Sequence, residues 1–137
     1  MRRLFQSRGV RRRVMMQQFG LVALGGAIGA ALRYGISLYL SGDGFPWATL
    51  SVNMIGSLLL GIVAVALTQE LISQDVALIL GTGVLGAFTT MSAFSVETLN
   101  MFQSQQTSSA IIYIALTMVI CPILAFLGWK IGDFFIA

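Results

Sequence analysis

Long apolar stretches alternate with short polar ones along most of the chain. Four stretches of at least about 20 residues are rich in hydrophobic side chains, at about residues 19–40, 47–67, 76–102 and 109–135. A helix of roughly 20 apolar residues crosses the hydrocarbon core of a bilayer, which is about 30 Å thick. The pattern therefore predicts an all-α membrane protein with four transmembrane helices and both termini on one side. The first stretch is too long to be the apolar part of a secretory signal.

The third stretch carries a group of hydroxyl side chains in its middle, between Gly86 and Glu97. These hydroxyl residues are Thr89, Thr90, Ser92 and Ser95. A bilayer core offers no water to polar groups, so such residues must face protein, an ion or a water-filled path. Hydroxyls can replace backbone hydrogen bonds, which makes a break in the third helix tolerable here. We interpret the segment as the functional site; the alternative is an unbroken helix whose hydroxyls bond back to its own carbonyls.

The first two stretches carry isolated polar residues. Asn53 lies on one helix face with Thr49 and Ser57, four residues before and after it. An Asn amide at this depth either holds two helices together or lines an ion path. Arg33 must pair, face a water-filled vestibule or extend to the membrane surface. The first stretch also has two small residues at a spacing that favours close helix packing, Gly25 and Gly29.

Neutral hydrogen-bond donors predominate among the polar residues of the last three stretches. They are Asn53, Ser92, Ser95, Tyr113 and Thr117. Phe94 lies among them, and the edge of an aromatic ring carries partial positive charge. Donors without a fixed cation suit conduction, in which an ion must be held well enough to lose water and weakly enough to leave. The set favours a small anion. Cys121 continues the stripe of Tyr113 and Thr117, where we expect it to serve packing.

Composition and charge exclude several classes of protein. Hydrophobic residues make up 57% of the chain and charged residues only 9%, whereas soluble domains have about 25% charged residues. The sequence has no histidine and a single cysteine, and its carboxylates are scattered, so we expect no enzyme. A GxGxxG pattern at residues 81–86 lacks the acidic residue about 20 positions later that a dinucleotide fold requires. We interpret it as part of a glycine-rich half-helix.

Basic residues are concentrated before the first apolar stretch. Six of the eight Lys and Arg residues lie there, namely Arg2, Arg3, Arg8, Arg11, Arg12 and Arg13. We divide the chain into a basic N-terminal extension at residues 1–17 and a four-helix transmembrane domain at residues 18–137. Such a cluster holds an N-terminus in the cytoplasm and attracts anionic lipid, a simpler interpretation than nucleic-acid binding. Without it, Arg33 and Lys130 lie toward opposite sides, so the body can insert in either orientation.

Three segments combine small and polar residues at fixed spacings. They are GGxxGAxxRY from residue 25, TLxVNxxGS from residue 49 and GxxTTxSxFSxE from residue 86. Together they resemble the CrcB/Fluc family of fluoride channels. Each motif alone has little specificity, but the set occurs in the family's order over about residues 20–130.

The resemblance implies a fluoride-selective channel that exports fluoride passively across the cell inner membrane or plasma membrane. It implies a dual-topology, antiparallel homodimer of four-helix subunits with two pores and one central structural sodium ion. The implied pore residues are Asn53, Met91, Ser92, Phe94, Ser95, Tyr113 and Thr117. The same likeness places the backbone carbonyls of Gly86 and Thr89 on the sodium ion, at the break in the third helix. From its depth in the first helix, we expect Arg33 to lie in a vestibule.

Two positions depart from the family pattern. Met91 stands where a pore phenylalanine is usual, and Ala93 stands where a threonine is usual. The departures fit either a pore with altered anion contacts or a subunit that pairs with a paralogue, one pore of the pair being degenerate. Two other classes stay open. A small multidrug transporter would need an acid in the first helix, which this chain lacks, and an assembly subunit would use the hydroxyls for packing alone.

Overall fold

The computed structural model describes residues 2–40, 42 and 44–136, and within these ranges it describes side chains from residue 14 to residue 135. The arginine side chains of the basic N-terminal extension therefore lie outside the described residues.

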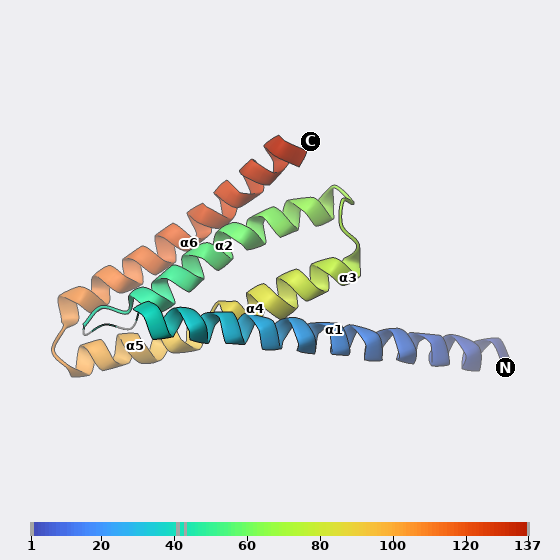
Figure 1. Ribbon diagram of the computed structural model, residues 1–137, viewed down its shortest axis with the longest axis horizontal. Coiled ribbons are helices and arrows are strands. Elements are labelled where there is room, and N and C mark those ends of the chain that lie inside the picture. The colour runs from blue at the N-terminus through green and yellow to red at the C-terminus, as the bar shows by residue number, and fades with distance from the viewer. Residues whose placement is uncertain (1, 41, 43, 137) are drawn as a thin grey trace.

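The described chain is built from helices (Figure 1). The three long helices are α1 (Arg2–Leu40), α2 (Trp47–Thr68) and α6 (Thr107–Ile136). Between α2 and α6 the chain forms shorter helices in succession: α3 (Gln74–Ala77), the π-helix η1 (Leu78–Leu85), α4 (Gly86–Phe88) and α5 (Met91–Gln103).

Within the described residues, four segments are long and apolar enough to cross a membrane, as the hydrophobic pattern predicts. They are Val14–Leu40, Trp47–Thr68, Gln74–Gln103 and Thr107–Phe135. For these residues the prediction of an all-helical chain with four long apolar segments is thereby confirmed. Both ends of the chain lie toward the same end of the bundle, and α1 projects beyond the other helices there (Figure 1).

Helices α2 and α6 run side by side and touch through their backbones. A Cβ atom on Gly61 would collide with the carbonyl oxygen of Ala125, and a Cβ on Gly128 would collide with that of Leu58. Glycine at both positions lets the helix axes approach closely, which is how helices associate in lipid without a hydrophobic driving force.

Helix α1 packs against η1 in the same way. A Cβ on Gly25 would lie 2.6 Å from the carbonyl oxygen of Ile79, and one on Gly29 would meet the carbonyl of Val84. The close packing expected from this glycine pair is confirmed. Gly83 faces Gly25 across the contact, where a Cβ would lie 3.0 Å from the Gly25 Cα.

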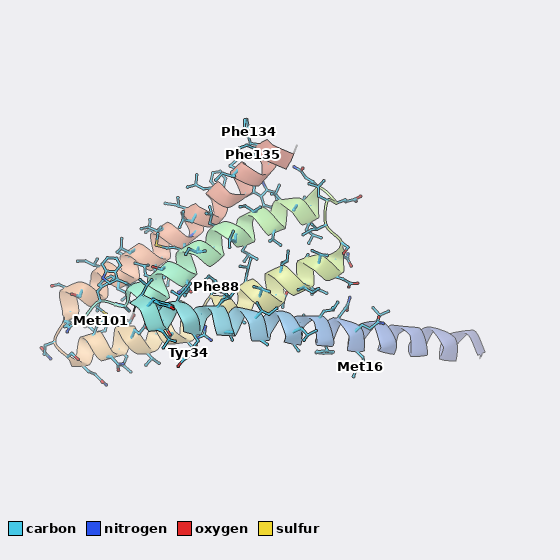
Figure 2. The ribbon with its side chains drawn as sticks, viewed as in Figure 1. Met16, Tyr34, Phe88, Met101, Phe134 and Phe135 are labelled. Atoms are coloured by element: carbon cyan, nitrogen blue, oxygen red, sulfur yellow. The ribbon has the colours of Figure 1, made fainter. Side chains whose placement is uncertain are left out.

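The small interior lies where α2, α5 and α6 meet. Its buried apolar residues are Leu50, Phe94, Met101, Ala110 and Tyr113. The outside of the bundle is apolar as well: Figure 2 shows Met16 on the projecting part of α1 and Phe134 at the end of α6, and both side chains are exposed. An apolar exterior around a small interior with few buried polar groups suits a protein whose solvent is lipid.

Candidate functional site

The backbone leaves helical geometry at two residues of the third membrane segment. Thr89 has φ −79° and ψ 153°, and Thr90 has φ −150° and ψ 114°, both extended. Helix α4 ends before them and α5 begins directly after them. Extended residues between two helices leave backbone donors and acceptors that need other partners.

Asn53 of α2 forms hydrogen bonds with both the amide and the carbonyl of Thr90. The Asn53 Nδ2 donates to the Thr90 carbonyl oxygen at 3.2 Å, and the Thr90 amide donates to the Asn53 Oδ1 at 2.8 Å. Asn53 is buried. Its amide therefore pairs with the backbone as a neighbouring strand would and fixes α5 against α2.

Two hydroxyls close the ends of the adjoining helices. Thr89 Oγ1 donates to the Leu85 carbonyl at 3.0 Å, and Thr90 Oγ1 accepts from the Ala93 amide at 3.1 Å as an N-cap. Capping residues of this type stabilise helix starts by about 0.5–2 kcal/mol. The hydroxyl-rich sequence of the segment is thus explained partly by its backbone.

Arg33 of α1 reaches the same region. Its Nε donates to the Ala87 carbonyl at 3.1 Å, at the end of α4. In a continued helix that carbonyl would accept from the Met91 amide. The guanidinium thus binds a carbonyl at a helix C-terminus, where the helix dipole favours a cation.

Two carbonyls of the segment lose the amide that a continued helix would give them. The amide four residues after Gly86 is that of Thr90, which donates to Asn53 instead. The amide four residues after Thr89 is that of Ala93, which donates to the Thr90 hydroxyl. Gly86 and Thr89 are the two positions whose carbonyls the sequence analysis assigned to sodium.

The Glu97 carboxyl group joins three helices. Thr49 Oγ1 of α2 donates to Glu97 Oε1 at 2.6 Å, and the Tyr113 hydroxyl of α6 donates to Glu97 Oε2 at 2.7 Å. Phe94 packs on Tyr113 with ring centroids 5.0 Å apart. Sequence reasoning did not assign Thr49 or Glu97 to the site. The sequence features that could have identified them are the position of Thr49 on the Asn53 face and the presence of a carboxylate, Glu97, inside an apolar stretch.

Thr117 is the buried hydroxyl that stays without a partner. Its side chain is 6% exposed, and its Oγ1 makes no hydrogen bond within the described residues. It lines a cavity of about 340 Å³ between α2, α5 and α6. The polar residues around that cavity are Asn53, Ser57, Thr89, Thr90, Thr117 and Cys121. An unsatisfied buried hydroxyl costs about 1–3 kcal/mol, so a hydrogen-bond acceptor that reached this group would stabilise the site.

The pore residues expected from the sequence fall into two groups. Asn53, Phe94, Tyr113 and Thr117 are buried within the subunit. Met91, Ser92 and Ser95 lie on the exposed side of α5, although Met91 also borders the Thr117 cavity.

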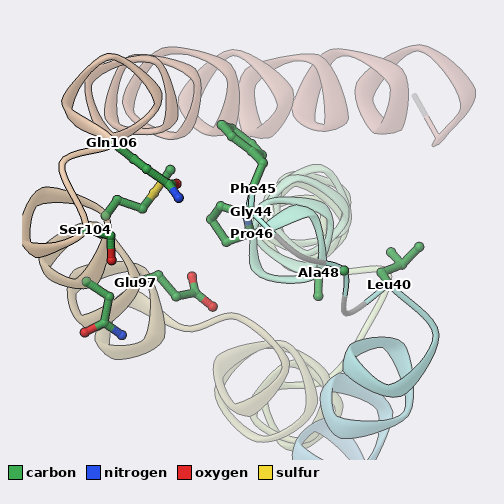
Figure 3. A pocket seen from close by; sticks show the side chains of 11 residues that line it. Leu40, Gly44, Phe45, Pro46, Ala48, Glu97, Ser104 and Gln106 are labelled. Carbon is green, nitrogen blue, oxygen red and sulfur yellow. The ribbon is translucent and has the colours of Figure 1, made fainter.

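Two further clefts meet at Glu97. One, of about 340 Å³, lies beside the connection between α1 and α2. Figure 3 shows Glu97 and Ser104 on one side of this cleft and Phe45 and Pro46 on another. The second, of about 310 Å³, has Arg33 and Thr90 in its wall as well as Glu97. Polar side chains therefore continue from the loop end of the bundle to the extended segment.

A protein-family model described as "CrcB-like protein, Camphor Resistance (CrcB)" matches residues 20–129. Three relatives are each named "Fluoride-specific ion channel FluC". The Hyphomonas neptunium protein is 46% identical over 118 residues, which cover 82% of this chain and 93% of the relative. The Magnetococcus marinus protein is 43% identical over 119 residues, covering 84% and 97%. A Thermus thermophilus protein is 42% identical over 120 residues, covering 85% and 96%.

Proposed function

The chain belongs to the CrcB family of multi-pass membrane proteins, which are channels and not enzymes, and we propose that it is itself a fluoride-selective channel through which fluoride leaves the cell passively. The observation that carries the proposal is Thr117: its buried hydroxyl has no partner within the described residues, and its side chain lines a cavity that Asn53 also lines. Fluoride is a small, strong hydrogen-bond acceptor. A hydrogen-bond donor that has no protein partner can replace part of its water.

The path from the loop end to this cavity is lined by polar groups, with one cation beside it. Arg33 stands in the wall of a cleft that also contains Thr90 and Glu97, so a cation and a carboxylate lie beside the same path. The Thr49 and Tyr113 hydroxyls are held by the Glu97 carboxylate, ready to turn toward a stronger acceptor. Phe94 packs on Tyr113, which places a ring near these donors.

We further propose that a structural sodium ion is held by the carbonyls of Gly86 and Thr89. The fit is supported by the redirected amides of Thr90 and Ala93, which leave these oxygens without helical partners. Oxygen atoms suit a hard cation. One chain offers two of them, so a second, antiparallel copy would complete the coordination and give the antiparallel homodimer that the family resemblance implies. The ion would tie the two extended segments together.

A mixed dimer with a paralogue is the second candidate for the assembly, because Met91 and Ala93 depart from the family pattern. Met91 is 59% exposed, so a change there alters the surface of the subunit as well as the cavity. Chemical cross-linking of the purified protein distinguishes the two assemblies, since only a homodimer forms a cross-linked pair from this chain alone.

The test of function is fluoride efflux from liposomes measured with a fluoride electrode. Wild-type protein releases the trapped fluoride, and Phe94→Ile lowers the rate strongly because it removes the ring from Tyr113. The matched control is Phe134→Ile, since Phe134 is 81% exposed at the far end of α6. Efflux no faster than from protein-free liposomes would refute the proposal.

Sodium is tested separately. Exchange of all sodium for a large organic cation should lower both efflux and the thermal stability of the dimer. Unchanged stability and efflux after thorough exchange would reject the sodium site and leave the fluoride channel standing.

A further inference from the structure

Three sulfur-containing residues line the cavity that Thr117 also lines. Met91, the first residue of α5, lines one side of the cavity, and Met118 and Cys121 line it from α6. We propose that this cavity is a binding site for a soft monovalent metal ion, Cu⁺ or Ag⁺, with the Cys121 sulfur as anchor and the two thioethers as further ligands.

The placement of the three residues suits convergence on one ion. Met118 and Cys121 are three residues apart on α6 and so share a helix face. Met91 and Met118 are 59% and 45% exposed, which leaves both side chains free to change rotamer. Methionine has three rotatable side-chain bonds and a polarizable sulfur. Both thioethers can therefore follow an ion that Cys121 has bound.

The lining of the cavity selects the class of metal. Residues bordering it include no Asp, Glu, His, Lys or Arg. Thiolate and thioether ligands prefer Cu⁺, whereas harder cations prefer carboxylates or imidazole. The cavity is therefore unsuited to Mg²⁺ or Ca²⁺ and suited to a soft cation.

Charge is conserved in the binding step. The Cys121 S–H bond breaks and a sulfur–metal bond forms, while the proton passes to water and no electron is transferred. The thiolate and the monovalent ion sum to zero charge, so the complex adds no net charge to a low-dielectric site.

Thr117 supplies a second, independent observation. Its hydroxyl is buried without a partner, and it precedes Cys121 by four residues on the same helix face. Ser57 of α2 lines the same cavity as Cys121. A thiolate needs donors that a neutral thiol does not, and these two hydroxyls can provide them.

Binding is tested by titrating Ag⁺, as the nitrate in chloride-free buffer, into the purified full chain and counting bound silver by native mass spectrometry. Wild type should bind one Ag⁺ per chain, and Cys121→Ser should bind none. Met91→Leu and Met118→Leu should each weaken binding by about tenfold, because each removes one ligand. The matched control is Met54→Leu, whose side chain does not border the cavity. Equal affinity in all three methionine variants, or silver bound to Cys121→Ser, would overturn the site.

One consequence rests on the proposed fluoride channel: a metal beside Thr117 obstructs fluoride. Ag⁺ should stop efflux from wild-type liposomes and spare Cys121→Ser. Silver that binds while efflux continues would contradict the obstruction. A wild-type protein that releases no fluoride would contradict the proposed function, and the binding result would stand by itself.

Discussion

The pair of helices α2 and α6 is built differently at its two ends. Toward the C-termini Gly61 and Gly128 lie directly against the backbone of the facing helix. Toward the N-termini the same helices carry Asn53 and Tyr113, which bind α5 by hydrogen bonds. The close contact fixes the helix pair, and the polar end then holds an interrupted segment that could not fix itself.

The largest effect is expected from breaking the close contact. Gly128→Ala places a Cβ against the Leu58 carbonyl, and the helices must separate. We expect a loss of about 3 kcal/mol or more in the free energy of unfolding, at the upper end for overpacking. Thermal unfolding in detergent measures it.

Gly20→Ala is the matched control for this change, because a Cβ there meets no atom within 4 Å. Its stability should equal or slightly exceed that of wild type, since alanine favours helix. If the two variants unfold alike, backbone contact does not hold α2 to α6.

Breaking the polar end at Asn53 should cost less stability and more activity. Asn53→Ala leaves the amide and the carbonyl of Thr90 without partners, which costs about 2 kcal/mol. Fluoride efflux should fall by about 100-fold, equivalent to roughly 2.7 kcal/mol of barrier. Unfolding and efflux are measured on the same preparation. Gln103→Ala, at the exposed end of α5, is the amide control. Wild-type efflux in Asn53→Ala would remove Asn53 from the site.

Tyr113→Phe sharpens the comparison by removing a single hydroxyl. It breaks the bond to Glu97 and keeps the ring that packs on Phe94, so we expect a loss of about 1.5 kcal/mol. Tyr39→Phe is the control, because Tyr39 is 89% exposed. Chemical denaturation of both variants measures the difference. Equal stability of the two would show that the Glu97 bond contributes nothing.

The smallest effect on stability is expected at Thr117, where a substitution should lower fluoride efflux without lowering the free energy of unfolding. Thr117→Val removes a hydroxyl that has no partner within the described residues, so the free energy of unfolding should change by less than about 0.5 kcal/mol or rise. Efflux should nevertheless fall by about tenfold, the effect of roughly 1.4 kcal/mol. Thr117→Ser, which keeps the hydroxyl, should retain most of the wild-type rate of fluoride efflux. Thr68→Val serves as control, since Thr68 is exposed and bonds to its own helix. A slow Thr117→Ser variant would mean that packing, and not the hydroxyl, matters.

Sequence and structure agree where a feature depends on neighbouring residues. Hydropathy predicts the four long helices because lipid requires about 20 apolar residues in a row. The spacing of Gly25 and Gly29 predicts a close helix contact for a similar reason: it concerns one face of one helix.

Features that depend on distant residues could not be predicted in detail. Asn53 could be recognised as a buried amide, yet its partner Thr90 lies 37 residues later. Glu97 appears in the sequence as the boundary of a polar segment, and its role as acceptor for Thr49 and Tyr113 depends on how three helices meet. Phe94 was expected beside an ion, and within the subunit it packs against Tyr113.

The central claim is that neutral hydrogen-bond donors at the polar end of α2 and α6 bind a small anion and replace part of its water. Paired efflux measurements on wild-type liposomes, with fluoride in one set and chloride in the other, test it most directly. The account predicts rapid fluoride release with chloride retained, because chloride is larger and a weaker acceptor. Equal rates for the two halides, or no release of either, would contradict it.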